Sequence, residues 1–514
     1  MAPPSPIIAQ EAEAEETHRH RLPLKENARL TEKWFPRACP IPAPEPRIYI
    51  AVRDALHMDS DIRVRNIETS FRSERARTPL KFGASVVEEV EYCTVRATVE
   101  NGRGEVADGY GGIFLMDFWG WPDFDLSHEV KSAAMAHITE EYCDLVRSYP
   151  DAAHPIEVFY DLEADLRTAN DAVCAQRELQ PPQTFLGALV CASPVDAALH
   201  DAFGIVNGID TYRGYGPDFM CDLSRWLGPD FEGRYVEEFI REQYLPEIPI
   251  FHLVGGLDKL TESEVDSSDP DDGLPNSLEA WVRRDGVYCL KVKLRGNDLE
   301  WDVQRTIDVH DIGERELAAL GIDELHVTAD TNEQCESPDY IVEFLHRIKE
   351  QSPACYERIL YIEQPTERDL TLNRHDMRPI AELKPVIVDE SLTDLESFDL
   401  AMELGWSGIA LKSCKCQSSD MIMAAKTKSL GIAYSVQDLT NPSLALIHSV
   451  GLGARTHTIM GVEANSRQFF PASTLPEEQR VHDGIFTVRR GRASTASLQG
   501  PGLGYQMEKM REGA

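Results

Sequence analysis

The second half of the chain alternates short apolar runs with segments of helical spacing. From about residue 248 onward, strand-like runs are separated by stretches such as PDYIVEFLHRIKE and SSDMIMAAKTKSLG. Strands and helices in alternation imply parallel strands joined by crossover helices. Eight such strands favour a closed β/α barrel over an open sheet. The predicted strands are 248–254, 287–293, 324–329, 358–362, 385–388, 407–411, 432–436 and 456–460.

The first part of the chain has a different organisation. Residues 62–112 alternate apolar and polar positions around a turn at Asn101-Gly102, which predicts an antiparallel meander. Helical patterns follow, so this region is of the α+β class. The predicted divisions are a flexible arm at 1–46, an α+β domain at 47–205, a barrel at 206–475 and a C-terminal segment at 476–514.

The composition excludes some partners. With 87 acidic and 51 basic residues, the net charge is −36. Such a chain should repel nucleic acid and anionic membranes, because phosphate binding depends on Lys and Arg. We find no run of about 18 or more uncharged apolar residues and no secretory signal pattern. Cysteines scattered through apolar runs, together with these observations, predict a cytoplasmic location.

Three successive predicted strands end in a carboxylate, namely Asp330, Glu363 and Asp389. The carboxyl ends of barrel strands meet at one face, where barrel enzymes do their chemistry. Asp330 and Asp389 have an alternative interpretation as helix N-caps, whereas Glu is a poor N-cap. Three clustered carboxylates repel one another unless a cation neutralises them. Hard oxygen ligands of this kind favour Mg²⁺.

Lysines accompany these acids. Lys291 and Lys293 lie two residues apart on one strand, so their side chains project to the same face. A solvated edge strand is the alternative, but a closed barrel has no edge. Lys412 ends a later strand and approaches the centre from another side. A lysine near a divalent cation has a lowered pKa and can act as a base.

The ordered set of motifs resembles the enolase superfamily and, within it, the muconate lactonizing enzyme subgroup. The likeness covers roughly residues 60–475, and the α+β region looks like the capping domain of that superfamily. It implies a modified TIM-like (β/α) barrel with an N-terminal α+β capping domain. The motifs are Lys291-Val-Lys293, Asp330-Thr-Asn332, Glu363-Gln-Pro365, Asp389-Glu390-Ser391 and Lys412 after GIAL.

The resemblance implies a reaction class. A Mg²⁺ ion would be held by Asp330, Glu363 and Asp389 and would bind the carboxylate of a small substrate. Lys293 would remove the proton α to that carboxylate, giving an enolate that the metal stabilises. Lys412 would return a proton on the opposite face in a racemase or epimerase. In a cycloisomerase or an elimination it would instead be the base or stabilise the anion electrostatically.

Other residues have supporting roles under the same resemblance. Lys291 and Asn332 would polarise the carboxylate or tune Lys293. After the seventh strand the family often carries a Glu, where this chain has SVQDLTNPS. Asp438 is the candidate for that acid, and Gln437 fits almost as well. The paired aspartates of dipeptide epimerases are missing from MGVEANSRQF, which disfavours a dipeptide substrate.

The sequence therefore predicts an enolase-superfamily isomerase, that is, a racemase, epimerase or cycloisomerase. An acid-sugar dehydratase on the same fold is the first alternative, although His448 and His457 do not follow the seventh strand where its histidine is expected. A metal-dependent hydrolase and a catalytically inactive binding protein are further alternatives. The likeness is compatible with a homo-oligomer, and no surface pattern in the sequence indicates one.

Two segments of the capping region are candidates for a lid over the substrate. The run FRSERARTPLKFG carries a local cluster of positive charge, and GYGGIFLMDFWGWPDF offers Trp119 and Trp121. A lid could bind a second anionic or polar end of the substrate. The alternative is a solvated loop with an aromatic packing cluster. The basic residues of the first segment are Arg72, Arg75, Arg77 and Lys81.

Overall fold

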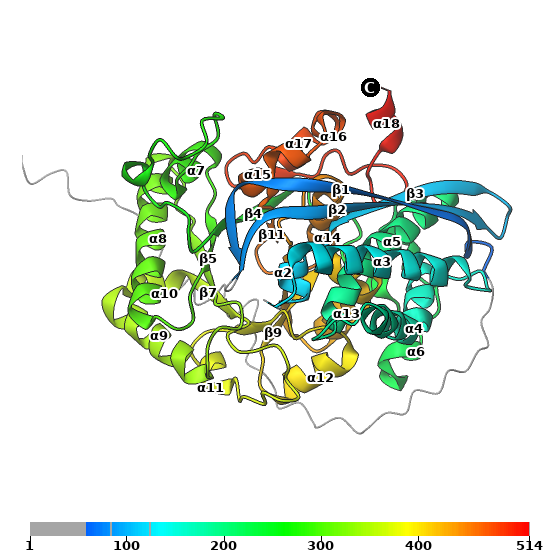
Figure 1. The fold of residues 1–514 in the computed structure, drawn as a ribbon, viewed down its shortest axis with the longest axis horizontal. Coiled ribbons are helices and arrows are strands. Elements are labelled where there is room, and N and C mark those ends of the chain that lie inside the picture. The colour runs from blue at the N-terminus through cyan, green and yellow to red at the C-terminus, as the bar shows by residue number, and fades with distance from the viewer. Residues whose placement is uncertain (1–57, 83–84, 123–124, 513–514) are drawn as a thin grey trace, which may run out of the picture.

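The computed structural model describes residues 58–82, 85–122 and 125–512. Figure 1 shows a long antiparallel sheet beside a barrel that is surrounded by helices. The predicted arm at residues 1–46 lies outside the described residues.

The N-terminal sheet is the predicted meander, with strands in the order β1-β2-β3. The turn after β2 closes through a hydrogen bond from the Gly104 N–H to the Asn101 carbonyl (2.9 Å). Glycines let helix α5 lie directly on this sheet, because a Cβ atom at Gly111 would come within 2.0 Å of the Pro194 carbonyl oxygen. The elements are β1 (Ile62–Phe82), β2 (Ser85–Asn101), β3 (Val106–Phe114), α2 (Asp117–Gly120), α3 (His128–Arg147), α4 (Pro155–Gln176) and α5 (Phe185–Asn207).

Helix α5 is the most apolar helix of the fold. Among the described residues, it alone is long and apolar enough to cross a membrane. However, 94% of its most apolar window is buried inside the molecule, where it packs on β2 and β3. We therefore interpret α5 as a core helix.

In the described part of the chain, eight parallel strands close into the predicted barrel. Closure is through β11 and β4, with Val462 opposite Ile250. Seven strands lie where the sequence predicts them. The eighth prediction, 456–460, is wrong, because the chain turns there with Met460 at φ 63° before β11 begins. The strands are β4 (Glu247–Val254), β5 (Cys289–Lys293), β6 (His326–Asp330), β7 (Ile359–Glu363), β8 (Val386–Val388), β9 (Gly408–Lys412), β10 (Ala433–Gln437) and β11 (Val462–Glu463).

Helices separate the barrel strands, as alternating parallel strands require. The C-terminal segment adds strand β12 (Arg492–Ser494), which pairs antiparallel with β4, and its Leu503 N–H bonds Asp201 of α5 (2.8 Å). This segment thus contacts both domains. The main helices are α7 (Leu278–Asp285), α8 (Leu299–Ala319), α9 (Pro338–Gln351), α10 (Pro353–Arg358), α11 (Arg378–Ala381), α12 (Leu395–Glu403), α13 (Gln417–Ser429), α14 (Ser443–Arg455), α15 (Ser466–Phe469), α16 (Pro476–Val481), α17 (Asp483–Phe486) and α18 (Met507–Arg511).

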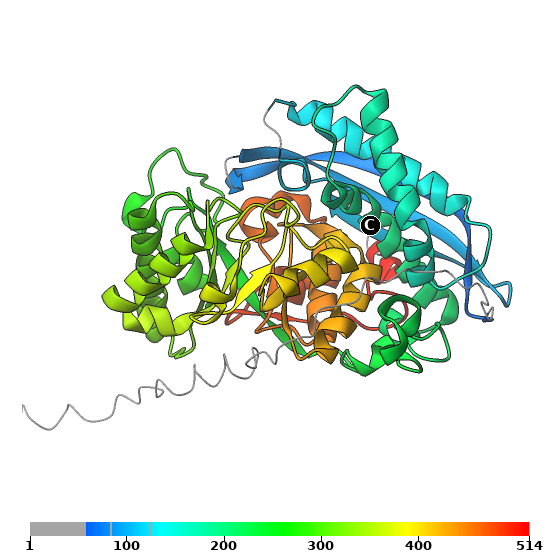
Figure 2. The ribbon, with the colours of Figure 1, turned by 90° about the horizontal axis from the view of Figure 1, so that it is seen from below.

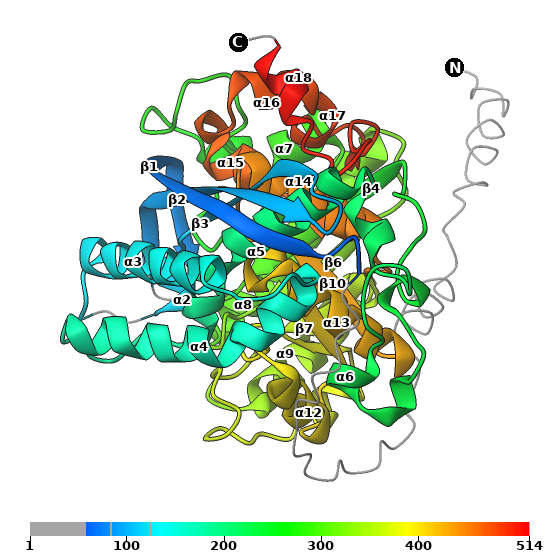
Figure 3. The ribbon, with the colours of Figure 1, turned by 90° about the vertical axis from the view of Figure 1, so that its right-hand side faces the viewer.

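The capping domain lies over the barrel mouth. Figures 2 and 3 show its sheet, with α3 and α4, along one side of the barrel. Its apolar core includes Leu253, Cys414 and Phe469, which come from the carboxyl ends of barrel strands and from α15. Cys414 and Cys416 are buried free thiols. This shared core joins the capping domain to the mouth of the barrel.

Candidate active site

The predicted carboxylates end neighbouring strands of the barrel. Lys293 is paired with Asp330, and Asp330 with Glu363, in the strand register. Paired residues of parallel strands point to the same side, so these three side chains share one level. Asp389 directly follows β8. The three acids are 0% exposed, so each needs a charged or polar partner.

Lys291 is the central cation of the site. Its ammonium lies 2.8 Å from Glu363 Oε1 and 3.2 Å from Asp330 Oδ2. It also lies 2.6 Å from Oε1 of Glu463, which ends the last barrel strand. Lys291 therefore links acids from three strands and is poorly placed to exchange a proton with a substrate.

Lys293 and Lys412 lie on opposite sides of the barrel. The Lys293 ammonium contacts Asp330, and the Lys412 ammonium lies 2.5 Å from Asp389 Oδ2. Their strands, β5 and β9, are four steps apart in the closed order of eight. The strands between them end in the three acids. This is the arrangement that the sequence predicts for two amines flanking a carboxylate cluster.

The charges set the protonation states of the acids. Burial alone would raise the pKa of Asp330, but the Lys293 and Lys291 ammonium groups lower it to about 2. Lys412 and Lys415 likewise hold the pKa of Asp389 below its ordinary value, against the effect of burial. Both aspartates are therefore ionised at neutral pH.

The pKa values of Glu363 and Lys412 are raised, in contrast to those of the two aspartates. Burial, with the charges of Asp330 and Asp389, raises the pKa of Glu363 well above its ordinary value. Burial would lower the pKa of Lys412, but the Asp389 carboxylate raises it. Lys412 therefore carries its proton in this arrangement. The predicted lowering of a lysine pKa depends on a cation that competes for the same carboxylates.

The donor set fits a hard divalent cation in its chemistry. Carboxylate oxygens are the ligands that Mg²⁺ prefers, and three of them end adjacent strands here. Among the residues that the structure describes, no three His, Cys, Asp or Glu side chains are drawn together around one point. Each predicted ligand instead forms an ion pair with a lysine. A bound cation would therefore replace lysine ammonium groups as the partner of these carboxylate oxygens.

Asn332 and Glu390 form a polar group above Asp330. The Asn332 N–H donates to Asp330 Oδ1 (2.7 Å), with Asn332 in the left-handed region at φ 44°. Its side-chain amide donates to Glu390 Oε1 (3.3 Å). Burial and the charge of Asp389 raise the pKa of Glu390 to about 7. Asn332 thus orients Asp330 through its backbone. The supporting role expected of it in catalysis stays a prediction.

The structure distinguishes the two candidates after the seventh strand. Gln437 is paired with Lys412 in the register, and its amide donates to Glu363 Oε2 (2.6 Å). Asp438 instead accepts bonds from Asn441 and Ser449. The placement of Asp438 in the site is therefore corrected. Successive strand residues point to opposite faces, and here the glutamine faces the acids.

Two charged residues of the site are not predicted from the sequence. Glu463 ends β11, and the misplaced eighth strand hides its position. Applying the same strand-then-acid pattern to MGVE finds it. Lys415 lies in a short 3₁₀ helix after β9, and its ammonium bonds the Asp389 carbonyl (2.6 Å) and Oδ1 (3.1 Å). No regular spacing indicates that contact.

Trp119 of the capping domain covers the site. The Lys412 ammonium lies 4.6 Å from the centre of its ring, and its indole N–H donates to Glu390 Oε1 (2.9 Å). Arg368 donates to the Trp119 carbonyl (2.8 Å) while pairing with Glu333. One of the two predicted lid tryptophans therefore closes the site. Trp121 packs in a separate cluster with Ala134, Cys174 and Leu179.

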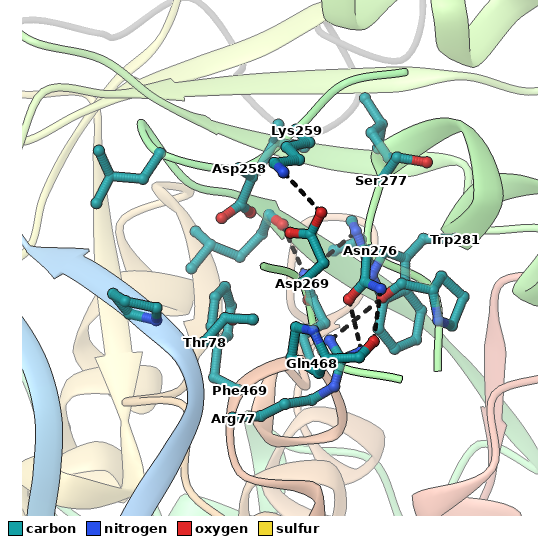
Figure 4. A pocket seen from close by; sticks show the side chains of 18 of the residues that line it. Arg77, Thr78, Asp258, Lys259, Asp269, Asn276, Ser277, Trp281, Gln468 and Phe469 are labelled. Atoms are coloured by element: carbon teal, nitrogen blue, oxygen red, sulfur yellow. Dashed lines mark hydrogen bonds and ion pairs between the residues drawn. The ribbon is translucent and has the colours of Figure 1, made fainter. Parts of the chain in front are cut away.

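The basic segment of the capping domain has another role. Arg77 binds both carboxylate oxygens of Asp272 (2.6 and 2.9 Å) and the Asn276 side chain (2.7 Å), beside a cavity of about 360 Å³ shown in Figure 4. Arg72 pairs with Glu74. Arg77 therefore joins the hairpin of β1 and β2 to the acidic loop at residues 262–277 of the barrel. The Lys81 side chain lies outside the described part.

Comparison with known proteins supports the predicted family. Residues 274–511, which include every predicted site residue, match the family model described as "Enolase C-terminal domain-like". The matched part of the chain holds barrel strands β5 to β11 and most of the C-terminal segment. The predicted resemblance to the enolase superfamily is confirmed. No match was found among curated proteins.

Solved structures of the superfamily share the whole two-domain architecture. A dipeptide epimerase from Enterococcus faecalis has a TM-score of 0.54 at 14% identity, covering 86% of this chain and 99% of its own. An N-succinyl Arg/Lys racemase from Bacillus cereus gives 0.54 at 15%, covering 88% and 97%. A muconate lactonizing enzyme from Pseudomonas fluorescens gives 0.52 at 16%, covering 88% and 99%. At these identities the likeness establishes the fold.

Proposed function

We propose that this protein is a Mg²⁺-dependent enzyme that removes the proton α to a substrate carboxylate and works as a racemase, epimerase or cycloisomerase. One observation carries the proposal. Lys293 and Lys412 approach from opposite sides of the barrel, and each touches a buried carboxylate of the cluster between them. A carbon acid held there would have an amine on either face.

The lysines have distinct tasks in this proposal. The Lys293 Nζ atom takes the α-proton, and the Lys412 ammonium delivers a proton to the opposite face. Lys291, held between Glu363 and Glu463, stays protonated and balances their charge. The cover formed by Trp119 excludes water, which strengthens each of these electrostatic contacts.

The acids would hold the metal. Asp330, Glu363 and Asp389 are its proposed ligands, and Mg²⁺ when bound supplies positive charge that stabilises an enolate oxygen. Asn332 fixes the orientation of Asp330, and Gln437 fixes that of Glu363. Hydrogen bonds of this kind, made to the ligands of a metal, tune the affinity of the site for that metal.

An isomerase fits these residues better than the alternatives. Dehydration starts from the same enolate, but His448 bonds Gln417 and the His457 N–H bonds Tyr434, away from the acids. A metal-dependent hydrolase normally uses histidine ligands, and the proposed ligand set is all carboxylate. The racemase, epimerase and lactonizing enzyme named above agree with proton transfer at carbon.

Deuterium exchange tests the proposal. The protein with Mg²⁺ in D₂O is incubated with a library of acid sugars, amino-acid derivatives and cyclic carboxylates, and deuterium at the α-carbon is read by NMR. We expect exchange with at least one acid, lost on chelation of the metal and, for one of its stereoisomers, lost in Lys293→Ala. Cleavage by water without exchange would instead support the hydrolase, and exchange of both stereoisomers that survives Lys293→Ala would contradict the proposed base.

A further inference from the structure

Glu390 differs from the neighbouring acids of the site in having no cationic partner. Each of the other carboxylates after β6, β7 and β8 that face the site pairs with a Lys or Arg. Among the described residues, no Lys, Arg or His nitrogen lies within ion-pair distance of Glu390. The paired acids are Asp330 with Lys293, Glu333 with Arg368, Glu363 with Lys291 and Asp389 with Lys412.

One oxygen of Glu390 has no hydrogen-bond partner among the described residues. Its Oε1 atom accepts from two neutral groups, the Trp119 indole (2.9 Å) and the Asn332 amide (3.3 Å). Its Oε2 atom is buried and, within the described residues, receives no hydrogen bond. The residue is only 2% exposed, so bulk water does not compensate. A buried carboxylate oxygen left in this state is costly unless a ligand completes it.

The surroundings of Glu390 favour a cation. Asp389 is its neighbour in the chain, and Asn332 links it to Asp330 through hydrogen bonds to both carboxylates. Asp330 and Asp389 belong to the proposed metal site, so Glu390 lies beside the place where the substrate carboxylate would bind. A ligand group that binds beside Glu390 would therefore meet several negative charges and an oxygen atom, Oε2, that lacks a hydrogen-bond donor.

We propose that Glu390 binds an ammonium group of the substrate through Oε2, so that the protein acts on carboxylic acids that also carry a positively charged amine. The inference rests on the proposed function. An ammonium group supplies both the missing donor and the missing charge, and hydrogen bonds between charged groups are about twice as strong as neutral ones. A hydroxyl group would supply only the donor.

Matched substrate sets test this assignment. Each set holds one carboxylic acid with an ammonium group, the same acid with a hydroxyl group there, and the same acid with hydrogen there. We measure KM and kcat for α-deuterium exchange in the Mg²⁺-loaded protein. Binding of the same acids is measured separately by thermal shift in Lys293→Met, which does not depend on turnover.

The variants isolate the charge of Glu390. We expect Glu390→Gln to raise KM for the ammonium acid at least about tenfold and to leave the hydrogen analogue within about twofold. Glu390→Asp should keep part of the preference for the ammonium acid. Glu367→Gln is the control, because it makes the same change on an exposed acid after β7.

Three results would overturn the inference. The first is equal KM values for the three acids of a set. The second is a KM for the hydroxyl acid that matches the KM for the ammonium acid. The third is that Glu390→Gln weakens Mg²⁺ binding by the same factor whichever acid is present. Absence of exchange with all acids would contradict the proposed function instead. In that case the thermal-shift preference, present or absent, still decides the role of Glu390.

Discussion

At the scale of single residues, the chemistry depends on which lysine meets which face of the substrate. The amines of Lys293 and Lys412 each contact one acid of the cluster, on opposite sides of the barrel. Neither can replace the other, because their strands are separated by half the barrel. The two amines should therefore act on opposite stereoisomers.

We predict that Lys293→Ala and Lys412→Ala each abolish α-proton exchange for only one stereoisomer of a substrate. General acid–base catalysis is worth about 10²- to 10⁴-fold, so each loss should fall in that range. Exchange of the separate stereoisomers is followed by NMR in D₂O. Equal losses for both stereoisomers in both variants would contradict the two-sided arrangement.

The contact of Gln437 with Glu363 gives a second prediction at this scale. Gln437→Leu leaves Glu363 Oε2 without its donor and should weaken Mg²⁺ binding by about tenfold, as loss of a supporting contact does elsewhere. Asp438→Asn is the matched control, because Asp438 bonds Asn441 and Ser449. Titration calorimetry with Mg²⁺ measures both. A larger effect from Asp438→Asn would restore the sequence-based choice.

At the scale of elements, one arginine helps to hold the cover over the site. Arg368, in the loop after β7, bonds the Trp119 carbonyl and pairs with Glu333. The Trp119 side chain also bonds Glu390 after β8. The Arg368 contact thus joins the cover to a second loop of the barrel.

We predict that Arg368→Met increases hydrogen exchange in residues 115–122, measured by mass spectrometry, because the capping segment loses its bond to the barrel. Arg374→Met is the control, since Arg374 forms an exposed pair with Glu403 in the same loop region. Faster exchange in both variants, or in neither, would show that Arg368 does not hold the cover.

The elements also show what the sequence can and cannot predict. Asp330, Glu363 and Lys412 are predictable because each ends a strand of four or more residues with a clear apolar pattern. Strand β11 has only two residues, so no periodicity marks it and Glu463 is missed. The contacts of Lys415, Arg368 and Trp119 join segments far apart in the chain, and local spacing carries no information about them.

At the scale of the whole molecule, the two domains share one core and a buried polar network. His154, at the start of α4, is 0% exposed, and its ring packs against His200 and Tyr215. The Tyr215 hydroxyl in turn accepts a hydrogen bond from the side-chain amide of Gln417 in the barrel (3.1 Å). Burial lowers the pKa of His154 to about 3.

This histidine should make folding sensitive to acid. The unfolded chain binds a proton at His154 below about pH 6.5, whereas the folded protein does so only near 3, so its contribution to stability is lost as pH falls between these values. At pH 5 the loss is about 2 kcal/mol. We predict that His154→Asn, which keeps a helix N-cap, loses less Tm between pH 7.5 and pH 5 than the wild type. An equal or larger loss would contradict the neutral buried imidazole.

The most direct test of the whole account is a crystal structure grown with Mn²⁺ as a stand-in for Mg²⁺, with the ion located by anomalous scattering. The account predicts one ion bound by Asp330, Glu363 and Asp389, with the ammonium groups of Lys293 and Lys412 on either side of it. An ion bound elsewhere, or the present lysine–carboxylate pairs left intact at saturating Mn²⁺, would contradict it.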